Sequence, residues 1–123
     1  MTHPHSRRFR DQRGQASIEF LGFLPILLAL ALASVQLGLA VYASLQAGTA
    51  ARAAARTASH SAPRIGYDRA GRAAMSDWLA DDTTFTRSAA GDGVTVTARV
   101  TIPSVVPGVD FGHAEKSSTM PRD

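Results

Sequence analysis

A single carboxylate lies at the start of a long apolar run, and its surroundings call for a chemical explanation. Glu19 follows the dipeptide Gly14-Gln15, and no side chain from Phe20 to Leu45 is charged. An ionised side chain costs about 2.5–3.5 kcal/mol at the centre of a membrane helix and less near an interface. Glu19 must therefore either lie at a polar boundary or find a partner.

The residues before Glu19 allow two interpretations. In the first, the carboxylate lies at headgroup level and Arg13 neutralises it. In the second, the chain is cut after Gly14, so that Gln15 becomes the first residue. Its new α-amine would be cationic at neutral pH, because the pKa of such an amine is about 7.7–8.0. The amine of a neighbouring subunit, displaced along the helix axis, would then pair with Glu19 and give it a role in assembly.

The other residues that could do chemistry form no catalytic or metal-binding pattern. The four histidines are His3, His5, His60 and His113. The first two have no further ligands nearby in the sequence, and the last two have no evident nucleophile. Asp81-Asp82 are adjacent at the end of an expected helix, which is more typical of a solvated turn. With no cysteine in the chain, a thiolate site is excluded. We expect no metal, no cofactor and no enzymatic activity.

The element that must position Glu19 is a long helix, predicted over residues 15–59. Residues 18–45 are apolar enough to cross a hydrocarbon core of about 30 Å, and membrane lipid is therefore an expected partner. Pro25 is expected to kink the helix locally. The run from Ala47 to Ala58 is rich in alanine, the best helix former, and extends the helix outside the membrane.

Small residues recur along this helix at alternating steps of four and three, a spacing typical of a helix-packing seam. This small-residue stripe consists of Ala33, Leu37, Ala40, Ser44, Ala47, Ala51, Ala54 and Ala58. We interpret it as a surface for packing against another helix.

Positive charge is concentrated ahead of the apolar run. The basic residues there are Arg7, Arg8, Arg10 and Arg13, opposed only by Asp11, in a chain of net charge +3. Positive residues beside a span remain in the cytoplasm. Residues 1–14 are therefore predicted to be a basic cytoplasmic leader, disordered over residues 1–13. A nucleic-acid partner is not expected.

Residues 60–123 are predicted to form a small extracytoplasmic domain, which makes the chain an α+β protein. A second, shorter helix is expected over Tyr67 to Ala80, with Trp78 as the main core residue. Residues 94–102 alternate between apolar and polar side chains, the pattern of a half-buried strand. Phe85 to Ser88 and His113 to Met120 are expected to pair with it, in an antiparallel sheet of two or three strands. Such a sheet must pack on a helix to be stable.

The motifs of the long helix resemble those of the TadE-like family. The residues that carry the resemblance are Arg13-Gly14-Gln15-Ala16, Glu19-Phe20, Pro25, Gly38, Tyr42 and the run Ala51-Arg52, Ala55-Arg56 and Ala58. Members are pilin-like bacterial membrane proteins encoded with the tight-adherence (Tad) pilus secretion machinery. The resemblance implies processing between Gly14 and Gln15 by a prepilin peptidase. One departure is Gln36, where family members often carry an acidic residue.

The leading hypothesis is therefore a minor pilin or pseudopilin in the cytoplasmic membrane, with its N-terminus in the cytoplasm. Its partners would be a prepilin peptidase, other pilin-like subunits and the pilus assembly platform. An uncleaved single-pass accessory protein, whose outer domain binds a partner, is the alternative. A secreted domain released after Val41-Tyr42-Ala43 is disfavoured, because the apolar run is long for a signal peptide.

Overall fold

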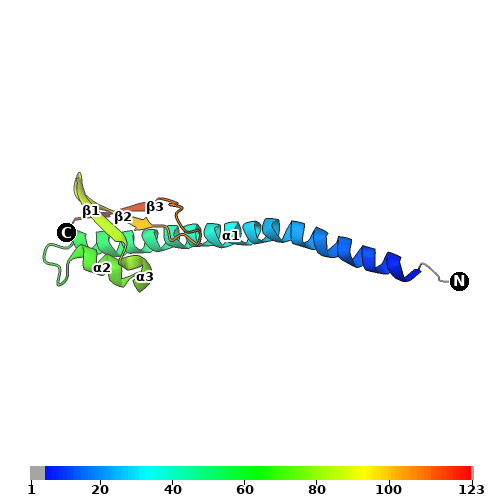
Figure 1. The fold of residues 1–123 in the computed structure, drawn as a ribbon. Coiled ribbons are helices and arrows are strands. Elements are labelled where there is room, and N and C mark those ends of the chain that lie inside the picture. Colours follow the sequence, from blue (N-terminus) through cyan, green and yellow to red (C-terminus); the bar gives the residue numbers. More distant parts are fainter. Residues whose placement is uncertain (1–4, 123) are drawn as a thin grey trace. The chain divides into compact units, whose positions relative to one another are not determined.

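A computed structural model describes the backbone of residues 5–122 and the side chains of residues 14–122. In chain order the elements are α1 (His5–Ser59), α2 (Tyr67–Ala73), α3 (Asp77–Ala80), β1 (Thr83–Ala90), β2 (Gly93–Thr101) and β3 (His113–Pro121) (Figure 1). A long apolar helix followed by short helices and an antiparallel sheet confirms the α+β class. The chain divides into two units, residues 1–35 and residues 36–123, and each is described by itself.

The first unit consists of the N-terminal part of α1. From Gly14 to Val35 every side chain is exposed except the half-exposed Leu24. The helix is long and apolar enough to cross a membrane, and none of its most apolar stretch is buried by the rest of the chain. A core helix of a soluble protein would be mostly buried, so this helix indicates a single-pass membrane protein.

The helix begins earlier than expected. The backbone is already helical from His5, whereas residues 1–13 were expected to be disordered. After Pro4 no proline or glycine interrupts the chain before Gly14. Arginine is also a good helix former, so the basic segment extends the helix instead of ending it.

In the second unit, a three-stranded sheet packs on the alanine-rich part of α1. The strand order is β1-β2-β3, and both pairings are antiparallel. Gly91, with a φ of 58°, turns the chain between β1 and β2, a conformation that glycine adopts without steric cost. A longer loop, residues 102–112, joins β2 to β3. In Figure 1 the sheet lies on one side of this part of α1, and α2 and α3 lie on another.

The core is built from small side chains on the helix and β-branched side chains on the central strand. Val94, Val96 and Val100 of β2 are fully buried. They face buried alanines of α1, which are Ala43, Ala47, Ala50, Ala51, Ala54, Ala55 and Ala58. Alanine brings the helix close to the sheet, and the strand supplies most of the bulk. The predicted alternation of β2 is therefore confirmed.

The other face of the sheet is polar and is held by cross-strand hydroxyl pairs. Thr95 and Thr119 join their hydroxyls at 2.7 Å, and Thr97 and Ser117 do so at 2.7 Å. Such pairs between directly opposed residues stabilise a sheet by about 0.2–1 kcal/mol each. They also fix the register of β3, whose expected existence is confirmed.

The expected single helix over Tyr67 to Ala80 is wrong, because the chain breaks at residues 74–76. The backbone N–H groups of Ala74 and Met75 bond to carbonyls only three residues back, which tightens and ends α2. Ser76 then begins α3 in an extended conformation. Its N–H donates to Oε1 of Gln46 on α1 at 2.9 Å, so a tertiary contact satisfies the group that a continuous helix would have used.

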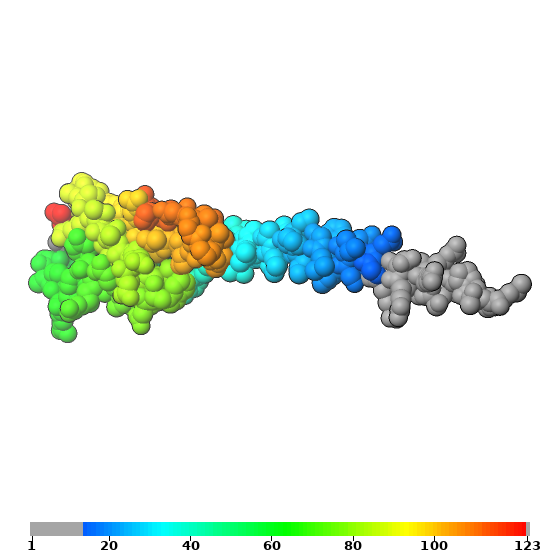
Figure 2. All heavy atoms as spheres, in the orientation of Figure 1, coloured from blue at the N-terminus to red at the C-terminus, as the bar shows by residue number. Residues whose placement is uncertain are grey.

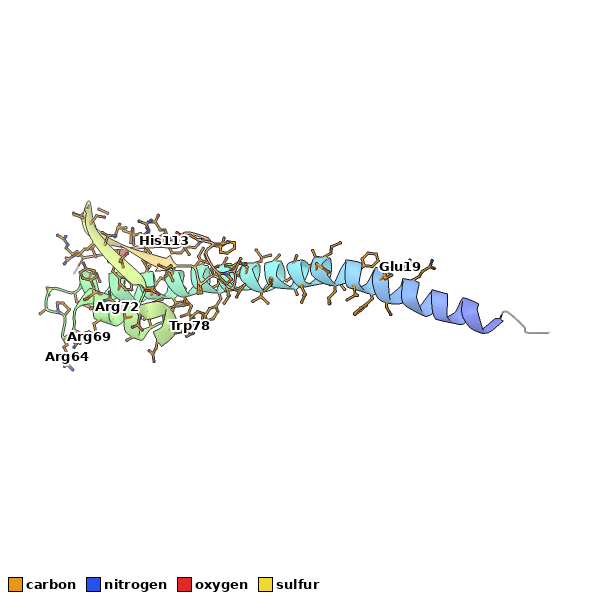
Figure 3. The ribbon with its side chains drawn as sticks, viewed as in Figure 1. Glu19, Arg64, Arg69, Arg72, Trp78 and His113 are labelled. Carbon is orange, nitrogen blue, oxygen red and sulfur yellow. The ribbon has the colours of Figure 1, made fainter. Side chains whose placement is uncertain are left out.

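Trp78 is not the core residue that was expected. It is 52% exposed, whereas Leu79 is 1% exposed and belongs to the core. The break before Ser76 sets the rotation of α3 so that Leu79 and Ala80 face the core. Trp78 therefore lies on the outside of the domain (Figure 3).

Candidate functional site

The residues of the expected processing segment are exposed on the first part of α1. Gly14 and Gln15 are both exposed. A Cβ placed on Gly14 would meet nothing within 4 Å. The need for glycine at this position therefore does not come from packing within the chain.

Glu19 is also exposed, and Figure 3 shows its side chain pointing away from the helix. Within residues 14–122, whose side chains the structure describes, Glu19 makes no hydrogen bond or ion pair. In lipid, this carboxylate would need a partner from outside the described part of the chain. The side chains of Arg7, Arg8, Arg10 and Arg13 lie outside the described residues.

The small-residue stripe divides into two parts with different surroundings. Ala47, Ala51, Ala54 and Ala58 are at most 5% exposed, and the chain's own sheet and α3 region cover them. Ala40 and Ser44 are half-buried, whereas Ala33 and Leu37 are exposed. The second part of the stripe is thus occupied within the chain, and only its first part is open to another helix.

Gln36 has a structural role that sequence reasoning missed. Its side chain is only 6% exposed. Its Nε2 donates to the carbonyl of Pro103 at 2.8 Å, and its Oε1 accepts from the N–H of Val105 at 3.0 Å. A carboxylate could not donate the first of these bonds. The amide therefore suits this position, and it ties the loop of residues 102–112 to the first residue of the second unit.

A second polar connection joins α1 to the start of α3. The hydroxyls of Tyr42 and Ser76 lie 2.5 Å apart, next to the Gln46 contact already described. The ring of Tyr42 stacks on that of Trp78, with centroids 5.8 Å apart and planes 6° from parallel. Together these contacts hold Trp78 in one place on the surface.

A shallow hollow of about 420 Å³ lies at the C-terminal end of α1. It is lined by Ala58, Ser59, His60, Ser61, Pro63, Gly66, Tyr67, Arg87 and Arg122. Its described lining includes one histidine and two arginines and no carboxylate. Among the described residues, no group of three or more histidine or carboxylate side chains could hold a metal ion.

Helix α2 approaches α1 closely at Gly71, next to Phe85, which packs against the core. Gly71 is buried, and a Cβ there would lie 2.4 Å from the Phe85 ring and 3.2 Å from the carbonyl of Ala50. The guanidinium of Arg72 lies over the same ring, 5.4 Å from its centroid. These contacts belong to the packing of the domain and show no catalytic arrangement.

Comparison with known proteins adds one positive finding. Residues 14–56 match the family model described as TadE-like protein. No curated protein and no solved structure matches the chain. The matched segment contains Gly14, Gln15 and Glu19, the apolar span and most of the alanine-rich extension. Residues 14–56 of this chain are therefore similar to the TadE-like family.

Proposed function

We propose that this protein is a minor pilin or pseudopilin, anchored in the cytoplasmic membrane, that acts in the assembly of a Tad-type pilus or secretion appendage. The observation that carries the proposal is the TadE-like match over residues 14–56. The matched family is pilus-associated, and the match covers both the apolar helix and the Gly14-Gln15 pair. The N-terminus lies in the cytoplasm, since the arginines precede the span.

In this proposal a prepilin peptidase cuts between Gly14 and Gln15. A protease needs the backbone around the scissile bond to leave the helix. Glycine is about 0.8–1.0 kcal/mol less favourable than alanine in a helix. Gly14 therefore makes it easier for α1 to unwind at the bond that the peptidase cuts. The exposure of both residues leaves the segment accessible.

After the cut, the new α-amine of Gln15 is the group best suited to meet Glu19 of a neighbouring subunit. Glu19 is exposed, and the described part of its own chain offers it no partner. A charge pair in a low-dielectric surrounding is strongly destabilised when only one member is removed. The pair would therefore favour one axial displacement between subunits.

The test is Glu19→Ala in the full-length protein, followed by co-purification with pilin-like subunits and the assembly platform from detergent extracts. We expect the variant to insert and to be processed, because removing the charge lowers the cost of insertion. It should nevertheless lose its partners. Glu19→Asp is the matched control and should be intermediate, since the charge remains but its reach is shorter.

Sequencing the N-terminus of the input protein separates processing from assembly. Wild-type recovery of partners with Glu19→Ala would show that the glutamate has no assembly role. A mature protein that still begins at Met1 would favour the alternative, an uncleaved accessory membrane protein.

A further inference from the structure

Several large apolar side chains of the second unit, which begins at Gln36, remain exposed. These side chains, which we call the apolar collar, are Leu37, Val41, Tyr42, Leu45, Trp78, Val109 and Phe111. They come from α1, from α3 and from the loop of residues 102–112. Their exposed fractions range from 37% for Tyr42 to 67% for Leu37. Soluble proteins rarely leave a large contiguous apolar patch open unless it binds a partner or a membrane.

The loop that contributes Val109 and Phe111 is held at this level by Gln36. The two hydrogen bonds from Gln36 reach Pro103 and Val105 in that loop. Asp110 is its only charged residue. In Figure 2 the loop, coloured orange, lies against the cyan part of α1 near residue 40. A largely apolar loop is thus fixed beside Gln36, the first residue of the second unit.

Trp78 and Tyr42 give the collar an amphipathic edge. Their rings are stacked, and the Tyr42 hydroxyl is hydrogen-bonded to Ser76. Tryptophan and tyrosine are enriched where a membrane meets water, because their rings are apolar and their N–H or O–H groups are polar. The collar therefore carries the residue types that favour a headgroup region.

Helix length places the collar at such a boundary. A hydrocarbon core of about 30 Å is crossed by about 20 helical residues, so a span that begins at Ile18 reaches the far side of the core near Leu37. The uncharged run continues to Leu45, which adds about 12 Å at about 1.5 Å per residue. Headgroup and interfacial regions bring the bilayer to about 40–45 Å, or about 5–8 Å beyond the core on each side. This layer covers the first part of the extra length, from Leu37 to about Tyr42.

We infer that the apolar collar lies in the lipid interface, so that the domain of residues 36–122 contacts the membrane surface directly. This inference rests on the membrane-anchoring part of the proposed function, and it does not depend on cleavage or on a pilus. The occupant is lipid because the four collar residues of α1 directly follow the span in the sequence. Burying the polar side chain of Gln36 under the loop also keeps its amide out of the hydrocarbon.

The charges near the collar define which lipid chemistry it uses. The segments 77–82 and 102–112, which contribute Trp78, Val109 and Phe111, contain four aspartates and no lysine or arginine. The aspartates are Asp77, Asp81, Asp82 and Asp110. These two segments therefore give anionic headgroups no cationic partner, and their carboxylates limit the depth of insertion. The contact should form in a bilayer of neutral phosphatidylcholine and should be insensitive to salt.

Trp78 allows a direct test, because it is the only tryptophan in the chain. The full-length protein is reconstituted in phosphatidylcholine vesicles that contain lipids brominated either close to the headgroup or near the chain ends. We expect a blue-shifted Trp78 emission that is protected from aqueous iodide. Bromine near the headgroup should cause a larger loss of emission than bromine near the chain ends.

Three variants that replace Trp78 with phenylalanine and move the reporter supply the comparison. Trp78→Phe with Leu27→Trp places the reporter in the span and should respond most to deep bromine. Trp78→Phe with Arg56→Trp places it on exposed α1 far from the collar and should respond only to iodide. Trp78→Phe with Phe111→Trp reports from the loop and should behave like native Trp78.

Each other result overturns the inference in a recognisable way. If Trp78 emission is quenched by iodide and not by bromolipid, as expected for the Arg56→Trp reporter, the collar lies in water. Trp78 could instead be protected from iodide without being quenched by bromolipid. If that protection is lost when the protein is diluted in lipid, the collar contacts a second copy of the protein and not lipid. Failure of the Leu27→Trp reporter to respond to bromolipid would overturn membrane anchoring itself. A collar that stays in water while Leu27→Trp responds leaves the proposed function intact.

Discussion

The two parts of α1 are one continuous helix, yet their side chains have opposite surroundings. Residues 14–35 are exposed almost throughout, whereas residues 43–58 include seven alanines that are at most 5% exposed. The difference follows from side-chain size. The first part carries leucine, isoleucine and phenylalanine, which provide a broad apolar surface for lipid. The second carries alanine, which lets a sheet approach closely.

The comparison shows that an apolar helix does not specify its partner by hydrophobicity alone. Most side chains of residues 18–32 are large and stand out from the helix, so they suit lipid or another membrane helix better than a closely packed strand. A flat alanine face instead favours packing on β-branched residues, which the strand β2 supplies. Similar substitutions should therefore have different effects in the two parts.

The largest expected effect is on processing, in the first part of α1. Gly14→Val should abolish cleavage and leave the full-length protein in the membrane, because a branched side chain next to the scissile bond would collide with the peptidase. The fold should not change, since a Cβ at Gly14 meets nothing within 4 Å. N-terminal sequencing of membrane fractions measures the outcome. Normal maturation of Gly14→Val would show that the leader interpretation is incorrect.

The next largest effect is on domain stability, and it should differ between the two parts of the small-residue stripe. Ala51→Leu should destabilise the domain by about 1–3 kcal/mol or more, because it overpacks a position with no exposed surface. The matched control is Ala33→Leu, which is exposed and should leave domain stability unchanged. Thermal unfolding of the detergent-solubilised protein, followed by circular dichroism, compares the two. Equal midpoints would contradict the assignment of Ala51 to the core.

A similar effect is expected where α2 meets α1. Gly71→Ala should lower the free energy of unfolding by about 1–3 kcal/mol, because the new Cβ would lie 2.4 Å from the Phe85 ring. Gly22→Ala is the control in the first part of α1, where the Cβ meets nothing within 4 Å. There the gain in helix propensity should leave stability equal or higher. Equal stability of both variants would indicate that Phe85 can yield without cost.

The smallest effect concerns the amide of Gln36. Gln36→Glu loses the donor to the half-buried Pro103 carbonyl. It should cost about 0.5–1.5 kcal/mol, the net contribution of one hydrogen bond, with faster hydrogen exchange in residues 103–111. Gln46→Glu is the matched control, because Oε1 of Gln46 accepts from Ser76 and a carboxylate can still accept. Hydrogen exchange read by mass spectrometry measures both variants. Equal protection of the loop would show that Gln36 does not hold it.

Much of this architecture could be predicted from the sequence, because it depends on local periodicity. The uncharged run marks the apolar helix, and the alternation of residues 94–102 marks the central strand. The turn residues His60 to Gly66 mark the end of α1, which closes at Ser59. The Gly14-Gln15 and Glu19 spacing resembles that of the TadE-like family, and the match over residues 14–56 confirms this resemblance. Such features arise from neighbours along the chain.

Only the tertiary structure decided which surfaces cover one another. Residues 67–80 have a helical pattern, but the bond from Ser76 to Gln46 breaks the helix and turns Trp78 outward. The small-residue stripe has one regular spacing, yet the chain's own sheet covers only its second part. Gln36 looked like a departure from the family pattern until its two bonds to the loop appeared. These outcomes depend on contacts between residues far apart in the chain, and periodicity carries no information about such contacts.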